Sequence, residues 1–286
     1  MAETIDAHHH LWSYHPAEYG WISKEMRDLA RDFSPDDLHA EMQKSRIDGT
    51  VVVQARQTLQ ETEWLLSLAK SHPFLRGVVG WAPIASESFP AHLERFAEEK
   101  KLKGLRHVIQ DEPDENFILR SDFNRGISAL TNSGLVYDIL IFARHLPPAI
   151  QFVDQHPNQV FVLDHIAKPS IGKSILDPWR AHIRQLAKRK NVYCKLSGMV
   201  TEANWSKWRM EDLQPYLDTV LEAFGPQRLM VGSDWPVCLL ATTYDGWFAT
   251  LHKMLCPLSA SEKENIFGNV ASDVYRLHDK ENLIAQ

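Results

Sequence analysis

Short runs of apolar residues recur along the chain, and each is followed by a longer segment with polar and apolar positions at helical spacing. Continuous apolar runs of this kind are typical of parallel strands buried on both faces. Eight such strands are predicted. They cover Thr4–His8, Gly49–Ala55, Leu75–Ala82, Leu102–Val108, Leu135–Ile141, Val160–Asp164, Val192–Lys195 and Leu229–Ser233.

The segments between the strands are predicted to be helical. The start of the first predicted helix is clear from its residues. Ser34 can cap a helix, Pro35 suits the first helical position, and Asp36 and Asp37 place acidic side chains in the first turn. Gly49 lies just beyond the end of this helix. The other predicted helices cover Glu61–Ser71, Phe89–Glu99, Ser121–Ser133, Pro147–His156, Pro178–Arg189, Glu211–Phe224, Tyr244–Met254 and Ser261–Leu277.

This alternation predicts a single (β/α)8 barrel domain over residues 1–286, because no Gly/Ser linker or low-complexity segment divides the chain. An open doubly wound sheet is the alternative. No G-x-G-x-x-G or Walker A sequence follows a predicted strand, which weakens the dinucleotide-binding form of that alternative. We expect the last helix, Ser261–Leu277, to pack outside the last strand.

Composition indicates an ordinary globular protein, with 286 residues, 44% hydrophobic, 24% charged and a net charge of -6. The mild acidity and the lack of a Lys/Arg-rich tract argue against nucleic acid or an anionic membrane as partner. No apolar stretch approaches about 18 residues and no signal pattern opens the chain, which favours the cytoplasm. Cys194, Cys238 and Cys256 are expected to be reduced. The chain is compatible with a monomer or a homo-oligomer.

The first predicted strand ends in Asp6-Ala7-His8-His9-His10. Because side chains two apart on a strand share a face, His8 and His10 should project together while His9 points away. Two imidazoles side by side suit a borderline metal such as zinc. The alternatives are an expression-tag remnant or a pair of hydrogen-bonded core histidines.

Two later strands also end in polar residues. His165 follows the apolar run Val160–Leu163, and Asp234 follows Leu229–Val231 just before a Trp-Pro turn. A carboxylate at the end of a buried strand is costly unless it is paired or metal-bound. In a barrel the carboxyl ends of the strands form the active-site mouth, so His8, His10, His165 and Asp234 should meet there.

Four segments carry a resemblance to a known family. They are Asp6-Ala7-His8-His9-His10-Leu11-Trp12, Leu163-Asp164-His165-Ile166-Ala167-Lys168-Pro169, Gly232-Ser233-Asp234-Trp235-Pro236 and Ile266-Phe267-Gly268-Asn269-Val270-Ala271. In this order they resemble the amidohydrolase superfamily, and within it the branch of sugar lactonases of the L-fuconolactonase and L-rhamnonolactonase type. The resemblance implies a (β/α)8 barrel that hydrolyses a sugar lactone or ester with water. It also implies that His8, His10, His165 and Asp234 form the polar centre.

One departure from that pattern concerns the metal. Many amidohydrolases carry a bridging Lys or Glu on strand four and a His on strand five, whereas these strands here read Gly104-Leu105-Arg106-His107 and Tyr137-Asp138-Ile139-Leu140. We therefore expect at most one divalent ion, with zinc favoured, on His8, His10 and Asp234, and His165 as a fourth ligand or oxyanion donor. A weakly held ion and a site that works without metal both stay open.

The chemistry of lactone opening suggests further roles. Asp234 is the predicted base that takes a proton from water. Without a metal, the imidazoles with Arg106 and Lys195 would supply the positive field on the oxyanion. Asp138 could hydrogen-bond sugar hydroxyls or act as a second acid. The predicted substrate-binding residues are Trp12, Arg106, Asp138, Lys195 and Trp235.

The alternatives for these residues are structural. Arg106 and Lys195 could belong to ion pairs, and Trp12 and Trp235 could pack in the core. His9, His107 and Asp164 are expected to face the outer layer or to support the site. For the whole chain, a related decarboxylase is the nearer alternative to a lactone hydrolase. A non-enzymatic binding protein is the more distant one, and it predicts that the four mouth residues are dispersed.

Overall fold

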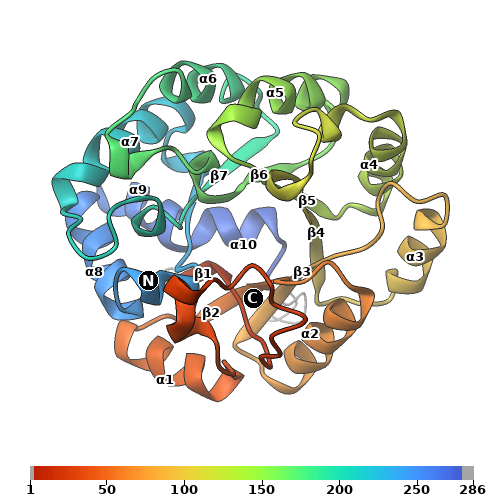
Figure 1. The fold of residues 1–286 in the computed structure, drawn as a ribbon, viewed down its shortest axis with the longest axis horizontal. Coiled ribbons are helices and arrows are strands. Elements are labelled where there is room, and N and C mark those ends of the chain that lie inside the picture. The colour runs from red at the N-terminus through yellow and green to blue at the C-terminus, as the bar shows by residue number, and fades with distance from the viewer. Residues whose placement is uncertain (1–2, 279–286) are drawn as a thin grey trace, which may run out of the picture.

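The computed structural model describes residues 3–278, in which eight parallel strands form a barrel ringed by helices (Figure 1). Each strand pairs with the next in the order β1 to β8. The predicted barrel is confirmed, and the open sheet is excluded. The strands are β1 (Ile5–His9), β2 (Gly49–Val53), β3 (Leu75–Gly80), β4 (Leu102–Val108), β5 (Val136–Leu140), β6 (Phe161–Leu163), β7 (Val192–Leu196) and β8 (Leu229–Val231).

The barrel closes through the residues that follow β8. Asp234 N donates to His8 O at 2.8 Å, and His10 N donates to Trp235 O at 2.6 Å. Gly232 allows this approach, because a Cβ there would lie only 2.7 Å from His8 Cβ. The contacts that close the barrel thus also bring His8, His10 and Asp234 together.

The helices follow the predicted pattern. Ser34 caps the first helix as expected, since its Oγ accepts from Asp37 N at 3.3 Å and its N donates to Asp37 Oδ2 at 2.9 Å. The helices are α1 (Pro35–Ser45), α2 (Leu59–Ser71), α3 (Phe89–Phe96), α4 (Ser121–Ser133), α5 (Leu146–Gln155), α6 (Trp179–Leu186), α7 (Met210–Phe224), α8 (Tyr244–Met254), α9 (Ala260–Glu264) and α10 (Val270–Val274).

The segment predicted as the last helix, Ser261–Leu277, is not one continuous helix and does not follow the expected path. Its range contains α9, a π-helical turn over Asn265–Asn269 and α10, and α10 lies across the middle of the ring of helices in Figure 1. Tyr275 and Leu277 pack with the apolar side chains inside the barrel rather than outside β8. The expected packing outside the last strand is therefore wrong for this end of the segment. The physical reason is that the barrel's apolar lower interior must be shielded from water.

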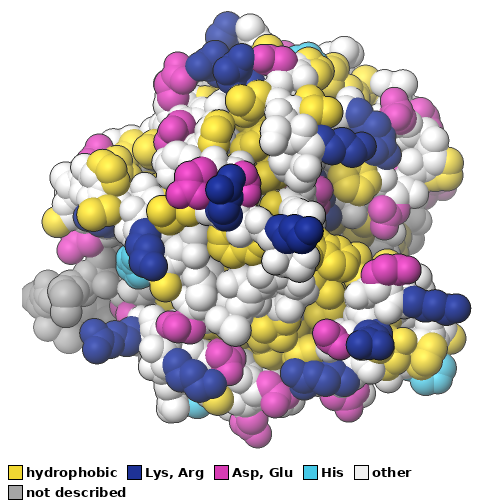
Figure 2. Space-filling model, turned by 60° about the vertical axis from the view of Figure 1, so that its left-hand side comes forward, with side chains coloured by type: hydrophobic (Ala, Val, Ile, Leu, Met, Phe, Trp, Pro, Cys, Tyr) yellow, Lys and Arg dark blue, Asp and Glu magenta, His cyan; other side chains and the backbone are white. Residues whose placement is uncertain are grey.

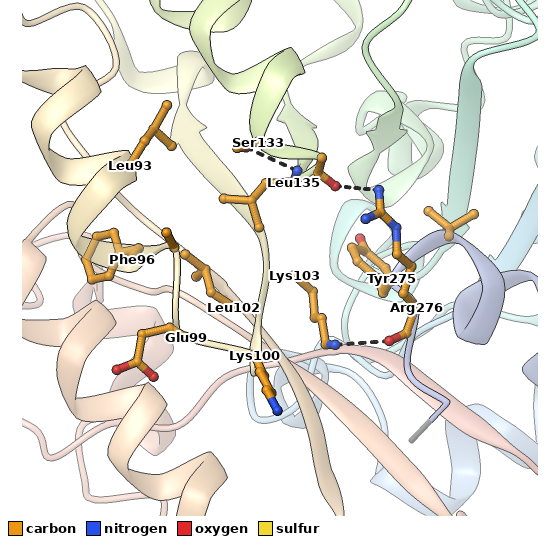
Figure 3. Close-up of a pocket in the computed structure, with 13 residues that line it drawn as sticks. Leu93, Phe96, Glu99, Lys100, Leu102, Lys103, Ser133, Leu135, Tyr275 and Arg276 are labelled. Atoms are coloured by element: carbon orange, nitrogen blue, oxygen red, sulfur yellow. Dashed lines mark hydrogen bonds between the residues drawn. The ribbon is translucent and has the colours of Figure 1, made fainter. Parts of the chain in front are cut away.

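The end of this segment is tied to neighbouring strands and helices. Lys103 Nζ donates to Arg276 O at 3.0 Å, and Arg276 Nη2 donates to Gly134 O at 2.7 Å (Figure 3). A cavity of about 300 Å³ lies beside it and is lined in part by Phe96, Leu102 and Tyr275. These contacts fix the C-terminal turn at the end of the barrel opposite the predicted mouth.

The surface carries both signs of charge. Figure 2 shows basic and acidic side chains interspersed over one face, with apolar side chains between them. Among residues 3–278, no helix is long and apolar enough to cross a membrane. Cys194 and Cys238 are buried and Cys256 is exposed, and all three are free thiols as predicted.

Candidate active site

The two histidines of β1 share a face, as the strand pattern predicted. His8 Nε2 and His10 Nε2 lie 3.2 Å apart. His9 points the other way, and its Nε2 lies 3.0 Å from Thr50 Oγ1. Both His8 and His10 are buried, so two imidazole edges meet in a space with little access for bulk water.

Asp234 and His165 complete the cluster from other strands. Asp234 Oδ1 lies 3.4 Å from His10 Nε2, 3.8 Å from His8 Nε2 and 3.9 Å from His165 Nε2. The structure thus brings together the four residues that the sequence placed at the mouth. The dispersed arrangement expected of a non-enzymatic protein is not found.

The backbone adopts an unusual conformation to place two of these side chains. Asp234 has a φ of 57°, and the four residues from His165 to Lys168 all have positive φ between 46° and 61°. Non-glycine residues in this region are strained and occur mostly at functional sites. Gly198, with a φ of 61°, passes close beneath His165, where a Cβ would lie 2.6 Å from His165 Nδ1. Gly198 therefore leaves room for the His165 ring.

Each imidazole is oriented through its Nδ1 atom. His10 Nδ1 lies 2.7 Å from Val53 O, and His165 Nδ1 lies 2.9 Å from Ser197 Oγ. His10 Nδ1 must carry a proton to bond a carbonyl. In the neutral ring Nε2 then has a lone pair that can bind a metal, and in the doubly protonated ring it has an N–H that can donate to Asp234. Such outer contacts are the usual means of orienting histidine ligands.

His8 has two competing partners at Nδ1. Asp164 Oδ1 lies 3.3 Å away and can accept a proton, whereas Lys195 Nζ lies 3.2 Å away and can donate one. With Asp164 as partner, His8 presents a lone pair at Nε2. With Lys195 as partner, it presents an N–H there. This imidazole can therefore face the mouth either as a ligand or as a donor.

The geometry of the cluster fits one zinc ion. Tetrahedral ligands at Zn–N and Zn–O distances of about 2.0–2.1 Å lie about 3.3 Å from one another. The Nε2 atoms of His8 and His10 and Oδ1 of Asp234 are 3.2 to 3.8 Å apart, and all three residues are buried. Two imidazoles and one carboxylate, with a fourth position left open, are a ligand set found in catalytic zinc sites.

A second set of possible metal ligands includes a carboxylate that is already paired with positively charged side chains. His8, Asp164 and His165 also lie close enough to hold a metal. However, Arg106 Nη1 donates to Asp164 Oδ2 at 2.9 Å, and Lys195 Nζ lies 3.0 Å from Asp164 Oδ1. A divalent ion there would have to displace two buried positive charges.

A layer of buried charges lies beneath the cluster. Lys195 Nζ donates to Asp138 Oδ2 at 2.5 Å and also contacts Asp164, and all three side chains have no exposed surface. Asp138 and Lys195 were predicted to contact substrate, but they do not line the mouth cavity. Their places as buried partners of one another match the ion-pair alternative. Arg106, by contrast, does line the cavity.

The cavity above the cluster has a volume of about 380 Å³. His10, Arg106, His165 and Asp234 contribute polar groups to it. The surrounding wall combines aromatic, aliphatic and polar side chains from the loops that follow the strands. The wall includes Trp21, Met26, Val108, Gln110, Asp111, Leu140, Phe142, Lys168, Thr201, Glu202, Trp205, Val237 and Leu240.

The two predicted mouth tryptophans pack in the core instead. Trp12 is 1% exposed, packs against Tyr19 and Phe33, and donates its Nε1 hydrogen to Arg31 O at 2.9 Å. Trp235 is buried against the same Phe33. Neither lines the cavity, because the turns after β1 and β8 direct both rings onto the segment between β1 and α1. Trp21 and Trp205 provide the aromatic faces of the mouth.

Several cavity residues were not predicted. Lys168 lies in the left-handed segment after β6, and Glu202 lies in a short helical turn after β7. Within the described residues, the Glu202 side chain has no hydrogen bond or ion pair. A usable signal was their place in loops after barrel strands, where active-site residues of this fold occur.

The pKa values of two carboxyl groups in the cavity are shifted in opposite directions. Burial raises the pKa of Asp234, but the charges of His165 and the hydrogen bond with His10 outweigh it and hold the pKa below its ordinary value. Burial raises the pKa of Glu202, with the neighbouring charge of Asp234 adding to the rise and Lys168 opposing it. Burial lowers the pKa of His165 to about 4. Paired carboxyls with divergent pKa values are typical of sites that combine a base and an acid.

A parallel barrel with one site histidine on β1, a second just after it, a third after β6 and an ionised aspartate after β8 defines a hydrolase of the amidohydrolase class. Comparison with known proteins agrees. The chain matches the amidohydrolase family over residues 5–277 and belongs to it.

Individual relatives cover nearly the whole chain. It is 43% identical to an L-fucono-1,5-lactonase of Burkholderia multivorans, covering 96% of this chain and 97% of that protein. An L-fucono-1,5-lactonase of Burkholderia ambifaria is 34% identical, with 97% of each covered. A crystal structure of an amidohydrolase from Burkholderia multivorans with bound zinc is 41% identical and has a TM-score of 0.93, covering 97% of this chain and 100% of that one.

Proposed function

We propose that this protein hydrolyses a sugar-acid lactone of the L-fucono-1,5-lactone type to the free acid. The observation that carries the proposal is the position of Asp234, an ionised carboxylate on the cavity surface with three imidazole Nε2 atoms within 3.9 Å of its Oδ1. The names of the two Burkholderia relatives favour a sugar lactone as the substrate.

Asp234 is the base of the proposed reaction. Its lowered pKa keeps it deprotonated at neutral pH, so it can accept a proton from a water held in the cavity. When bound to His8, His10 and Asp234, zinc would act as a Lewis acid and lower the pKa of nearby water. A solved amidohydrolase that is 41% identical to this chain contains bound zinc, which supports zinc as the metal.

The oxyanion that forms on the lactone carbonyl needs hydrogen-bond donors, of which at least one should be positively charged. Arg106 and His165 both line the cavity. The Arg106 guanidinium is held by Asp164 and by the carbonyl of Gln54, so it is already positioned before substrate binds. Fixed donors of this kind stabilise a developing negative charge without reorganisation. We assign Arg106 this role, with His165 as the second donor.

The leaving ring oxygen needs a proton, and we assign Glu202 as its source. Glu202 lines the cavity, has no other hydrogen-bond partner among residues 3–278, and has a raised pKa through burial. A raised pKa increases the protonated fraction of this carboxyl, and the protonated form can donate to an alkoxide as the ring opens. Asp234 and Glu202 would then act as base and acid on one substrate.

The cavity wall fits a sugar ring. Its volume of about 380 Å³ falls in the range typical of small-molecule sites. Trp21 and Trp205 offer aromatic faces for the C–H face of a ring, and Gln110, Asp111 and Lys168 offer polar groups for hydroxyls. We therefore assign recognition of the sugar to these five residues rather than to Trp12, Trp235, Asp138 and Lys195.

A lactone screen tests the function. Purified protein is incubated with five- and six-membered aldonolactones, with and without chelator, while acid release is followed with a pH indicator. We expect hydrolysis of L-fuconolactone or a close stereoisomer, and none by Asp234→Asn. Failure with every lactone, together with carbon dioxide release from an aromatic acid, would instead establish the decarboxylase alternative.

A further inference from the structure

The barrel holds a chain of polar contacts that leads from the C-terminal segment to the active site. Tyr275 Oη lies 2.8 Å from Asp138 Oδ1 and 2.9 Å from Oδ2. Asp138 accepts from Lys195 Nζ at 2.5 Å, and Lys195 Nζ lies 3.2 Å from His8 Nδ1 and 3.0 Å from Asp164 Oδ1. Every member is buried, so water cannot replace a lost contact at low cost.

We propose that Tyr275 is a positioning residue for the lactonase reaction, whose hydroxyl holds Asp138 and, through it, places Lys195 against His8 and Asp164. The inference rests on the proposed function, because it concerns the same site. Tyr275 itself lies on the far side of the barrel from the cavity and touches no substrate.

The Tyr275 hydroxyl is needed to keep Lys195 in place, because several groups compete for the protons of the Lys195 ammonium. This ammonium has three protons to share among Asp138, Asp164 and His8. With Tyr275 Oη as a second donor, Asp138 does not depend on Lys195 alone. Without that donor, the buried Asp138 carboxylate has only Lys195 to neutralise it, and the ammonium should move away from His8.

The C-terminal turn is held firmly enough to act in this way. Arg276 is fixed on both sides, by its own bond to Gly134 O and by the bond from Lys103, as Figure 3 shows. Tyr275 therefore has a defined position relative to β4 and the end of α4. A hydroxyl on this turn can set the position of Asp138 on β5.

The substitution Tyr275→Phe isolates the hydroxyl. The ring stays, and with it the contact of Lys195 Nζ, which lies 5.4 Å from the ring centroid. Tyr216→Phe is a matched control, because Tyr216 is also buried and its hydroxyl donates to the carbonyl of Ile175 at 3.1 Å. Both variants lose one buried hydroxyl, but only Tyr275→Phe affects the contacts of Lys195.

The test combines kinetics with spectroscopy. For Tyr275→Phe we expect kcat on the best lactone to fall about tenfold with KM within about twofold, since a hydrogen bond to a charged group is lost away from the substrate. We also expect the His8 imidazole nitrogen resonances to shift in a long-range ¹H–¹⁵N spectrum. Tyr216→Phe should show neither change, although we expect its melting temperature to fall by a similar amount.

Two outcomes would overturn the proposal. One is a kcat of Tyr275→Phe equal to that of Tyr216→Phe. The other is a set of His8 resonances identical to those of the unsubstituted protein. If the unsubstituted protein hydrolyses no lactone, the proposed function fails, but the resonances of His8 still decide whether Tyr275 positions this imidazole.

Discussion

The guanidinium of Arg106 donates to Asp164 Oδ2 at 2.9 Å, inside the barrel and directly beside His8. Many amidohydrolases carry a metal-bridging group on this strand, and here a fixed cation stands there instead. Because Lys195 contacts the other oxygen of Asp164, that carboxylate is committed to two positive groups. Arg106 and Lys195 together therefore limit the number of metal ions that the site can hold.

We therefore expect at most one zinc ion per chain. Protein purified in zinc-containing buffer and then desalted should contain one zinc ion or less per chain by elemental analysis. His10→Ala should lower that ratio, because it removes one of the three best-placed ligands. His39→Ala, on the exposed face of α1, is the control and should leave the ratio unchanged. A ratio of two in the unsubstituted protein would contradict the role given to Arg106 and Lys195.

Asp234→Asn should abolish most turnover while the fold is retained. An amide cannot accept a proton from water at neutral pH, so we expect kcat to fall by about 100- to 10,000-fold, the usual contribution of a general base. Circular dichroism should show an unchanged fold, since the backbone contact between Asp234 N and His8 O does not involve the side chain. A loss of only a few-fold would assign the base to another residue.

Glu202→Gln should slow the enzyme in a way that depends on the leaving group. We expect about a 100-fold loss with a sugar lactone, whose alkoxide needs a proton, and little loss with a lactone that releases a phenol. Asp245→Asn is the control, because Asp245 is an exposed carboxylate on α8 outside the cavity, and this variant should keep both rates. Equal losses with both leaving groups would remove Glu202 from the role of acid.

The same substitution should change the pH profile. The pKa of Glu202 is raised by burial, so the unsubstituted protein should lose activity on sugar lactones as the pH rises through that raised value and the carboxyl loses its proton. Glu202→Gln should lack this alkaline decline. A decline that persists unchanged in the variant would show that another group titrates.

Much of the site follows from local sequence rules, and the remainder depends on turns that those rules do not describe. The alternation of a strand places His8 and His10 on one face, and the apolar run before Asp234 places it at a strand end. Trp12 and Trp235 were misplaced because the direction of a side chain just beyond a strand depends on the turn, and Asp234 has a positive φ. Glu202 lies in an irregular loop with no periodic pattern, so only its distance from β7 could have suggested it.

The course of the C-terminal segment could not be predicted for a similar reason. Its helical pattern indicates an apolar face but does not say which surface that face covers. In the structure, Tyr275 and Leu277 belong to the apolar cluster inside the barrel, which also includes strand valines such as Val51 and Val79. This contact is formed by residues more than a hundred positions apart in the chain, which periodicity cannot detect.

Gly198→Ala should both destabilise the protein and impair the site. The φ of 61° is unfavourable for alanine, and the added Cβ would lie 2.6 Å from His165 Nδ1. We expect the free energy of unfolding to fall by about 1–3 kcal/mol and kcat to fall with it. Gly20→Ala is the control, because nothing lies within 4 Å of a Cβ there. Unchanged stability of Gly198→Ala in urea unfolding would show that the turn relaxes without cost.

His9 should contribute to acid sensitivity of the fold. Burial lowers its pKa from the ordinary 6.5 to about 3. Above pH 6.5 His9 is neutral in both the folded and unfolded states. As the pH falls below that value, the unfolded chain takes up a proton that the folded protein does not, and stability is lost toward about pH 3.

His9→Gln should therefore reduce the loss of stability between pH 7 and pH 4, because glutamine does not titrate and can still contact Thr50 Oγ1. The measurement is the free energy of unfolding in urea at a series of pH values across that window. His39→Gln, on the exposed face of α1, serves as the control and should follow the curve of the unsubstituted protein. If His9→Gln follows that same curve, acid sensitivity must come from the other buried histidines, of which His165 is the first to test.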